Sequence, residues 1–320
     1  MKALVFDGKE GKVGERKKPA SENGEALIQV HRAGICNTDL EIVKGYMEFQ
    51  GVLGHEFVGE VVDSKENQWI GKRVVGEINC YCGTCEFCRN GLGNHCPNRT
   101  VLGILNRNGV FAEYVSLPIH NLIPVPDSVP DEQAVFTEPL AAAFEILEQI
   151  RVTPEDRVVV IGDGKLGLLV AQVLRLSTPQ VLLLGKHPEH WEFLSEKGIK
   201  GMSVDQLEPK PEFDVAVEAS GSPAGLETAI SILKPRGTLV LKSTVARPNN
   251  SFNWNLLVIN EIQVIGSRCG PFKPAIEALK DKSVEVQSMI QKTYPLSNGV
   301  EALRHAGQKG MLKVQLMMND

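Results

Sequence analysis

The chain has 320 residues, of which 42% are hydrophobic and 23% charged, and its formal net charge is −5. This composition is typical of a globular protein with room for two domains of ordinary size. Basic residues form no stripe and no apolar run approaches the ~20 residues that cross a bilayer, so neither nucleic acid nor membrane is an expected partner. The N-terminus turns polar at Asp7, too early for the apolar core of a signal peptide, so we expect a cytoplasmic protein.

The first third of the chain is predicted to form a β domain. Short alternating or apolar runs are separated by glycine turns, a pattern typical of strands in a compact, barrel-like fold. These runs lie at residues 26–30, 57–62 and 73–76.

Five of the seven cysteines lie close together in this region, from Cys80 to Cys96. The spacing Cys82-x2-Cys85-x2-Cys88-x7-Cys96 places four thiols on one short segment, which in a reducing compartment indicates a metal site more often than disulfides. Four thiolates close a tetrahedral zinc site without an open position. We therefore predict a structural zinc ion held by these four residues, with Cys80 as an additional packing residue.

The pattern changes near residue 139, where an alanine-rich helix is expected over residues 140–150. Beyond residue 156, predicted strands and helices alternate, which indicates a doubly wound α/β fold with a parallel sheet and helices on both faces. The expected strands are residues 157–161, 181–184, 213–218, 238–241 and 262–265, and the expected helices are 165–176, 188–197 and 224–233. From about residue 270 shorter mixed elements follow, ending in a strand-like segment at residues 312–316.

A glycine-rich turn follows the first of these strands and opens the first helix. In this context the pattern GxGxxG predicts a dinucleotide site, in which the glycines permit a tight turn, close approach of the backbone to the pyrophosphate, and helix–strand packing. The alternative is a glycine turn that binds no nucleotide. The residues assigned to the coenzyme are Gly162, Gly164, Lys165, Leu166 and Gly167.

The second strand of the series is followed by Gly185, Lys186 and His187. An NAD site normally carries Asp or Glu about 20 residues past the glycines, where it binds the ribose hydroxyls, and neither residue occurs here. A small residue followed by two potential cations leaves room and charge for a 2′-phosphate, which predicts a preference for NADP over NAD. The alternative is that Lys186 and His187 are solvated loop residues.

A second set of metal-binding residue types is scattered along the chain. Cys36 lies in Gly-Ile-Cys-Asn-Thr-Asp, His55 and Glu56 lie in Gly-His-Glu-Phe-Val-Gly, and Glu138 directly precedes the alanine-rich helix. Each residue alone has an ordinary structural explanation, since a single cysteine is usually a small core residue.

These motifs, the four-cysteine segment and the glycine-rich turn occur in an order that resembles the medium-chain, zinc-dependent alcohol and polyol dehydrogenases over essentially the whole chain. The resemblance implies a GroES-like β-barrel catalytic domain at residues 1–139, a doubly wound Rossmann domain at 140–268 and a return to the catalytic domain at 269–320. It also implies an active site between the two domains.

By the same resemblance, Cys36 and His55 match ligands of a catalytic zinc ion, and Glu56 matches a glutamate that binds this zinc or lies just behind it. Thr38 matches the hydroxyl that contacts the substrate oxygen. Glu138 occurs where simple alcohol dehydrogenases carry a cysteine ligand, and a glutamate here is similar to sugar and polyol dehydrogenases. Whether Glu56 or Glu138 completes the zinc shell stays open, as does the end of the proton relay, where Glu41 takes the place of a histidine.

The implied activity is hydride transfer between an alcohol, polyol or sugar-type substrate, or its carbonyl form, and NAD(P). The metal would lower the pKa of the alcohol, and the coenzyme would accept the hydride. A homodimer or homotetramer joined through residues 262–265 is expected by analogy. The alternatives are a zinc-independent quinone or enone reductase, which usually lacks both metal sets, and a non-catalytic nucleotide-binding or redox-regulatory protein of the same fold.

Overall fold

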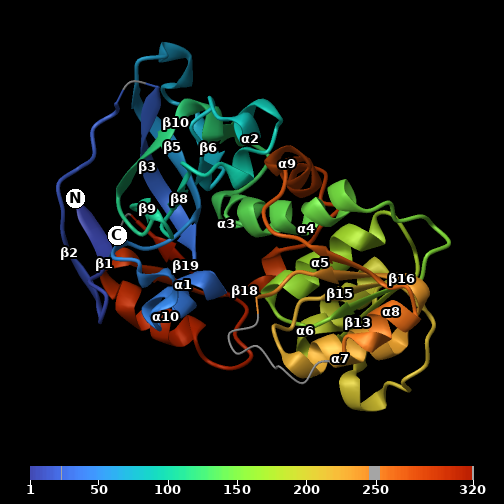
Figure 1. Ribbon diagram of the computed structural model, residues 1–320. Helices are drawn as coiled ribbons and strands as arrows, with labels where there is room; N and C mark the ends of the chain where they lie inside the picture. Colours follow the sequence, from blue (N-terminus) through green and yellow to red (C-terminus); the bar gives the residue numbers. More distant parts are fainter. Residues whose placement is uncertain (23, 245–252, 319–320) are drawn as a thin grey trace. The chain divides into compact units, whose positions relative to one another are not determined.

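The computed structural model describes residues 1–22, 24–244 and 253–318. The chain divides into two compact units, and Figure 1 colours them along the sequence. The first unit contains residues 1–138, 275–281 and 290–320, and the second contains residues 139–274 and 282–289. No helix within the described ranges combines the length and the apolar character that crossing a membrane requires.

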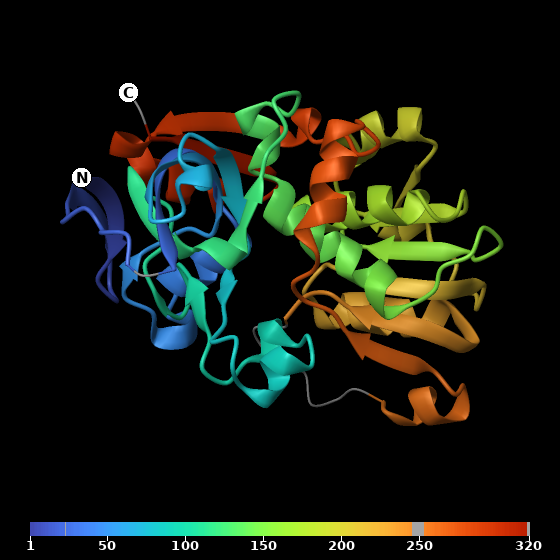
Figure 2. The same cartoon turned by 90° about the horizontal axis from the view of Figure 1, so that it is seen from above.

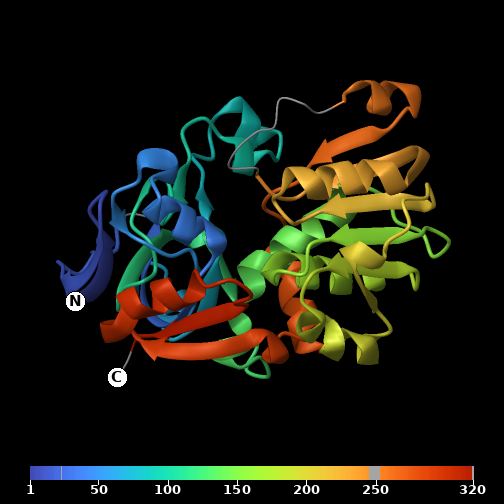
Figure 3. The same cartoon turned by 90° about the horizontal axis from the view of Figure 1, so that it is seen from below.

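The main sheet of the first unit joins strands from both ends of the chain. The C-terminal strand β19 runs antiparallel to β3 on one side and parallel to β18 on the other. Figure 3 shows these red C-terminal strands in the same unit as the blue N-terminal strands. In pairing order the strands are β11 (Leu122–Pro124), β6 (Arg73–Gly76), β5 (Glu56–Ser64), β3 (Glu25–Gly34), β19 (Lys313–Met317) and β18 (Ile290–Pro295), with β10 (Tyr114–Pro118) also paired to β3.

Two smaller sheets and several short helices complete the first unit. One sheet has the order β2 (Gly11–Glu15), β1 (Lys2–Phe6), β4 (Gly51–Val52), and the other has the order β7 (Asn79–Cys80), β8 (Thr100–Leu102), β9 (Asn106–Arg107). The helices are α1 (Asn37–Val43), α2 (Glu86–Arg89), α3 (Asp131–Ala134), α10 (Gly299–Ala306) and the 3-10 turns η1 (Tyr46–Glu48), η2 (Asn67–Trp69), η3 (Gly93–His95), η4 (Ile119–Asn121) and η8 (Leu296–Asn298). Large side chains such as Phe6, Phe111 and Phe136 are fully buried and form the core.

The second unit is built on a parallel sheet. Its central strand β12 is buried at every residue, which explains its uninterrupted Val-Val-Val-Ile sequence. The strand order is β14 (Lys200–Ser203), β13 (Val181–Gly185), β12 (Val158–Ile161), β15 (Phe213–Glu218), β16 (Leu233–Leu241) and β17 (Gln263–Gly266). This is the 3-2-1-4-5-6 order of a Rossmann sheet, so the predicted doubly wound fold is confirmed.

Helices lie on both faces of this sheet. The crossovers from β12 to β13 and from β15 to β16 run in opposite directions along the sheet, so right-handed connections place α5 (Lys165–Arg175) and α7 (Pro223–Ile232) on opposite faces (Figure 1). The other helices are α6 (Pro188–Trp191), α8 (Asn255–Ile259), the 3-10 turns η5 (Glu192–Lys197), η6 (Val204–Gln206) and η7 (Gln287–Met289), and α4 (Thr137–Gln149) and α9 (Phe272–Lys280), which each run from one unit into the other.

Two elements of the second unit differ from the sequence prediction. Strand β14 was not predicted, because Lys-Gly-Met-Ser neither alternates nor contains a β-branched residue, and pairing with β13 decides its conformation. The helix expected over residues 188–197 is one turn of α6 followed by the 3-10 turns of η5. At the opposite edge, β17 was expected and is present (Figure 2).

A half-buried ion pair in the first unit makes its stability depend on pH. His31 Nδ1 lies 3.1 Å from Asp131 Oδ2, and this hydrogen bond raises the pKa of His31 above 6.5 and lowers the pKa of Asp131. A histidine whose pKa is higher in the folded state than in the unfolded state stabilises the fold at pH values below the unfolded pKa. This contribution is lost as the pH rises through the folded pKa. We therefore expect His31→Gln to lower the unfolding free energy by about 1 kcal/mol at about pH 5.5 and by much less at about pH 9. Urea unfolding at the two pH values tests this, and an equal loss at both would contradict it.

Candidate active site

The glycine-rich turn after β12 has the geometry that a dinucleotide requires. Gly162 has φ +112°, and a Cβ there would lie 2.7 Å from the backbone nitrogen of Ser220. A Cβ on Gly167 would lie 1.8 Å from the carbonyl oxygen of Gly162, so only glycine lets α5 approach the turn. A Cβ on Gly164 would meet nothing within 4 Å, so space lies in front of the first turn of α5, where Lys165 and Leu166 begin the helix.

An acidic side chain lies at the end of β13, but it belongs to Asp163 of the glycine-rich turn and not to the segment after β13. Asp163 Oδ2 accepts hydrogen bonds from the backbone nitrogens of Lys186 at 2.7 Å and His187 at 2.6 Å, and Oδ1 lies 3.2 Å from His187 Nδ1. A Cβ on Gly185 would lie 2.2 Å from this carboxylate. Asp163 therefore fills the space beyond Gly185, and the sequence reasoning missed it because it lies 23 residues before Lys186.

The sulfur atoms of the four closely spaced cysteines, Cys82, Cys85, Cys88 and Cys96, lie near one another and form what we call the four-cysteine lobe. The Sγ–Sγ distances are 3.4 Å for Cys85–Cys88, 3.7 Å for Cys85–Cys96, 3.6 Å for Cys82–Cys96 and 4.0 Å for Cys82–Cys88. Corners of a tetrahedron with zinc–sulfur bonds of about 2.3 Å lie about 3.8 Å apart, so these residues fit a zinc ion. Cys80 does not join them, and burial raises the pKa of its thiol to about 11.

A second donor set combines a thiol, an imidazole and a carboxylate. One donor atom each of Cys36, His55 and Glu56 lies within 4.8 Å of the others, although the residues come from the start of α1 and the start of β5. Glu56 Oε1 is buried without a hydrogen-bond partner among the described residues, which suits a metal ligand. Thr38 is close by, because its Oγ1 lies 3.8 Å from Cys36 Sγ. This set fits zinc, which accepts sulfur, nitrogen and carboxylate oxygen.

Asp39, which the sequence analysis did not single out, holds this donor set in place. Its fully buried carboxylate accepts hydrogen bonds from the backbone nitrogens of Cys36 at 2.8 Å and Gly54 at 3.2 Å. Asp39 Oδ1 also lies 3.3 Å from His55 Nδ1, so a single carboxylate orients both ligand segments. Burial alone would lower the pKa of His55, but the charges of Asp39 and Cys36 outweigh it and raise this pKa well above its ordinary value. The same negative charges favour a cation here.

Lys313, on β19, is a second residue that the sequence analysis missed. Its ammonium group forms an ion pair with Glu56, and both side chains are only 1% exposed. Burial alone would lower the pKa of Lys313, but the charges of Glu56 and Cys36 raise it. The charge of Glu138 also acts on Lys313, but Glu138 is not among the clustered donor atoms. In this structure Glu56, and not Glu138, is therefore the carboxylate grouped with Cys36 and His55.

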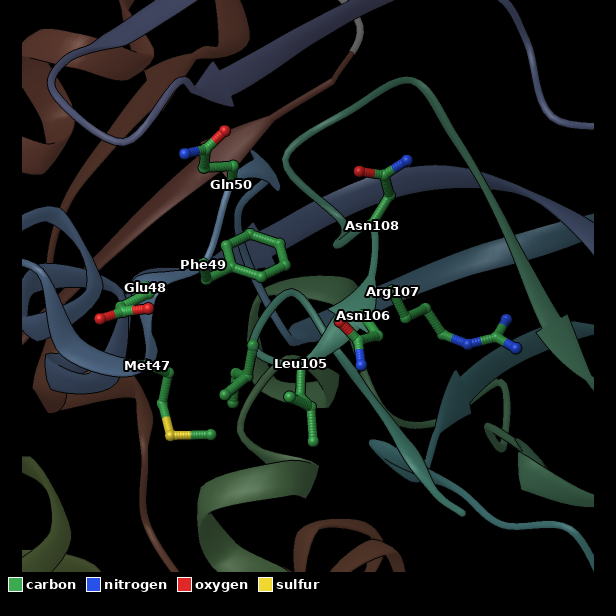
Figure 4. Close-up of a pocket in the computed structure, with 9 residues that line it drawn as sticks. Met47, Glu48, Phe49, Gln50, Leu105, Asn106, Arg107 and Asn108 are labelled. Carbon is green, nitrogen blue, oxygen red and sulfur yellow. The ribbon is translucent and has the colours of Figure 1, made fainter.

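A hollow of about 300 Å³ lies in the same unit, between residues 47–50 and 104–108 (Figure 4). Three non-glycine residues that line it have a left-handed backbone: Met47 with φ 63°, Glu48 with φ 51° and Asn106 with φ 51°. Such strained conformations cluster at functional sites.

Hydrogen bonds connect this hollow to the chain directly before His55. Asn108 Oδ1 accepts from the backbone nitrogen of Val52 at 3.0 Å, and the nitrogen of Val110 donates to the carbonyl oxygen of Gly54 at 3.0 Å. The loop at residues 104–108 is therefore fixed to the segment that leads to His55, a candidate metal ligand.

Comparison with known proteins agrees with this arrangement. Residues 22–127 match the alcohol dehydrogenase GroES-like domain, and residues 166–282 match the zinc-binding dehydrogenase domain. The chain is 30% identical to a sorbitol dehydrogenase from Halalkalibacterium halodurans over 319 residues, which cover 93% of this chain and 92% of that protein. It is 33% identical to an L-threonine 3-dehydrogenase from Chelativorans sp. over 289 residues, 83% of each protein. A zinc-binding dehydrogenase structure from Sinorhizobium meliloti, bound to NADP, has a TM-score of 0.90 at 26% identity and covers 99% of this chain and 98% of its own.

The chain therefore belongs to the medium-chain, zinc-dependent alcohol and polyol dehydrogenase family. It has the GroES-like and Rossmann architecture of that family, and it is a zinc-dependent oxidoreductase that acts on CH–OH groups of small molecules. The predicted family, fold class and enzyme class are confirmed. Neither a zinc-independent reductase nor a non-catalytic regulator is favoured by these relatives.

Proposed function

We propose that this dehydrogenase interconverts a polyol or sugar-type secondary alcohol and its ketone, with NADP as the preferred coenzyme. The observation that carries the proposal is the group of Cys36, His55 and Glu56 donor atoms beside the hydroxyl of Thr38. A zinc ion held by these residues would supply Lewis acidity that lowers the pKa of the substrate hydroxyl. The nicotinamide coenzyme would supply the hydride acceptor.

The chain's own residues then position the substrate and move its proton. Thr38 Oγ1, next to Cys36, holds the substrate oxygen and accepts its proton during oxidation. Asp39 fixes the Cys36 and His55 segments, and Lys313 keeps the Glu56 carboxylate oriented. From Thr38 the proton passes outward along a hydroxyl or water relay, and the partly exposed carboxylate of Glu41 lies in the same helix.

The polarity of the hollow in the first unit supports a hydroxylated substrate. The carboxylate of Glu48 and the amides of Gln50, Asn106 and Asn108 line it (Figure 4), and these groups bind hydroxyls in preference to an alkyl chain. Glu138 favours the same class of substrate, because a glutamate at this position is similar to sugar and polyol dehydrogenases. The matched Halalkalibacterium halodurans protein is a sorbitol dehydrogenase.

The preference for NADP is supported by the residues after β13. Lys186 and His187 follow Gly185, and Asp163 fixes the backbone of both. The Sinorhizobium meliloti structure that superposes on this chain holds NADP.

The experiment that tests the proposed function measures coenzyme reduction by the zinc-loaded enzyme with NADP⁺ and with NAD⁺. The panel contains polyols, aldoses, simple primary alcohols and hydroxy-amino acids. We expect kcat/KM to be highest for a polyol or sugar with NADP⁺. Faster turnover of a simple alcohol or a hydroxy-amino acid would contradict the substrate class, and faster turnover with NAD⁺ would contradict the coenzyme.

We further propose that the enzyme is a homodimer or a homotetramer assembled through the edge of the Rossmann sheet. Strand β17 is the last strand of the sheet and lies at its edge (orange in Figure 3). Val264 on this strand is 41% exposed. The preceding α8 exposes Val258 and Ile259 at 77% and 75%. An exposed edge strand with apolar neighbours is a template for pairing with a second copy.

The assembly proposal predicts that Val264→Glu shifts the enzyme to a monomer. A charge on β17 is costly to bury against a second copy of the same strand. Light scattering coupled to size exclusion measures the mass, and Ile70→Glu, at a residue 48% exposed in the first unit, is the matched control. An unchanged mass for Val264→Glu would contradict this interface.

A further inference from the structure

The Asp163 carboxylate forms hydrogen bonds to the turn that follows β13. One oxygen accepts two backbone hydrogen bonds, from Lys186 and His187, and the other lies 3.2 Å from His187 Nδ1. The side chain is only 9% exposed. Three N–H groups thus occupy most of its acceptor capacity, so Asp163 organises this turn more than it contacts a ligand itself.

The two histidines of the turn are fixed by the same residue. A carboxylate and a carbonyl oxygen only accept, so Nδ1 carries the hydrogen both in His187, which faces the Asp163 carboxylate, and in His190, which lies 3.0 Å from the Asp163 carbonyl oxygen. The rings stack at 4.8 Å between centroids and 28° between planes. With Nδ1 facing Asp163, Nε2 of His187 lies on the edge of the ring turned away from that carboxylate.

The residue types of this group also suit a metal ion, but its geometry does not. Zinc binds imidazole nitrogens at about 2.0–2.1 Å in a tetrahedron, which requires the lone pairs of the two rings to converge steeply. Here both Nδ1 atoms donate a hydrogen to Asp163, so neither offers a lone pair at the point where the three residues meet. The Asp163 oxygens also already accept hydrogen bonds. An anion with several oxygens, which needs donors that lie side by side, fits the arrangement better.

We propose that Asp163 is the positioning residue that builds the 2′-phosphate site of this enzyme, with His187 as the phosphate ligand and His190 as its stacked support. The inference rests on the proposed NADP preference and extends it to residues outside the β13 terminus. A phosphomonoester has a second pKa of about 6, so it readily shares a proton with an imidazole. Nε2 of His187 would share this proton with a phosphate oxygen, and the Asp163 carboxylate would balance the positive charge placed on the ring.

The test uses the full-length, zinc-loaded enzyme and two probes that need no turnover, adenosine 2′,5′-diphosphate and adenosine 5′-diphosphate. Calorimetry gives both dissociation constants for the wild type and for Asp163→Asn, His187→Gln and the double variant. We expect the wild type to prefer the 2′,5′-diphosphate. Either single substitution should weaken that probe about tenfold and change the 5′-diphosphate by less than about twofold. The double variant should lose no more than the larger single loss, because both residues act through one ring.

Asp214→Asn is the matched control, because Asp214 also accepts from a backbone nitrogen, that of Arg157 at 2.9 Å, and from a cation, Lys234 at 2.7 Å. It should leave the ratio of the two constants unchanged. Equal weakening of both probes by Asp163→Asn would assign Asp163 a merely structural role, and tighter binding of the 2′,5′-diphosphate would show that its charge repels phosphate. Either result overturns the inference.

The outcomes separate this inference from the proposals on which it rests. A wild type that prefers the 5′-diphosphate would refute the NADP preference and this inference together. A wild type that prefers the 2′,5′-diphosphate, with Asp163→Asn indistinguishable from it, would refute the inference alone. Neither result bears on the polyol or sugar substrate, which the turnover panel tests separately.

Discussion

Cys36→Ala is expected to lower kcat by about 10³-fold or more, because it removes a thiolate from the site that would hold the catalytic metal. Metal-based charge stabilisation is worth several kcal/mol in the transition state, and each 1.4 kcal/mol is about tenfold in rate. The loss should appear in kcat with every substrate, because the Lewis acid acts on the reacting oxygen itself. Steady-state kinetics with the best substrate of the panel measures it.

The control measurements distinguish a catalytic loss from a structural one. Coenzyme affinity should stay near that of the wild type, because the glycine-rich turn belongs to the other unit. Metal analysis should find about two zinc equivalents in the wild type and about one in Cys36→Ala, retained by the four-cysteine lobe. Cys80→Ala, which removes a buried thiol outside both donor sets, should keep turnover and both metals. Wild-type kcat in Cys36→Ala would refute the assignment of this donor set.

Lys313→Met is expected to lower the unfolding free energy of the zinc-free protein by about 3–5 kcal/mol, because it leaves the Glu56 carboxylate buried without its cation. A methionine fills much of the same volume, so the loss reports the missing charge more than a cavity. Urea unfolding near neutral pH measures it.

The double variant Glu56→Gln, Lys313→Met tests whether charge is the cause. Removing both charges relieves the buried, uncompensated carboxylate, so the double variant should recover at least about half of the stability lost in Lys313→Met. Stability unchanged from the wild type in the single variant would mean that water or another cation already compensates Glu56. A double variant less stable than the single one would attribute the loss to packing.

The features that could be predicted from the sequence are those formed by residues close together in the chain. The four clustered cysteines lie within one short segment, so spacing alone predicts that they come together. The glycine-rich turn follows its strand and opens its helix directly. The parallel, doubly wound fold of the second unit likewise follows from the alternation of strands and helices along the chain. In each case a local pattern determines the structure.

The features that the sequence did not reveal depend on partners brought together by folding. Lys313 meets Glu56 across 257 residues, and nothing near Lys313 in the chain marks it as buried. Asp39 lies beside Cys36 in sequence, yet its task becomes visible only when β5 brings Gly54 and His55 against it. Asp163 likewise carried no signal, because the second residue of a GxGxxG turn is free to vary.

The position of β19 also constrains how the polypeptide is made. Because β19 pairs with β3 on one side and β18 on the other, the nascent N-terminal region leaves the ribosome with the β3 edge open until residues 313–317 are synthesised. The Rossmann strands, all contained in residues 158–266, are complete much earlier and can fold during translation. The Glu56 carboxylate has no ammonium partner until Lys313 has been translated. A ribosome that stops before β19 therefore releases a chain whose first unit exposes an unpaired strand edge and is prone to aggregate.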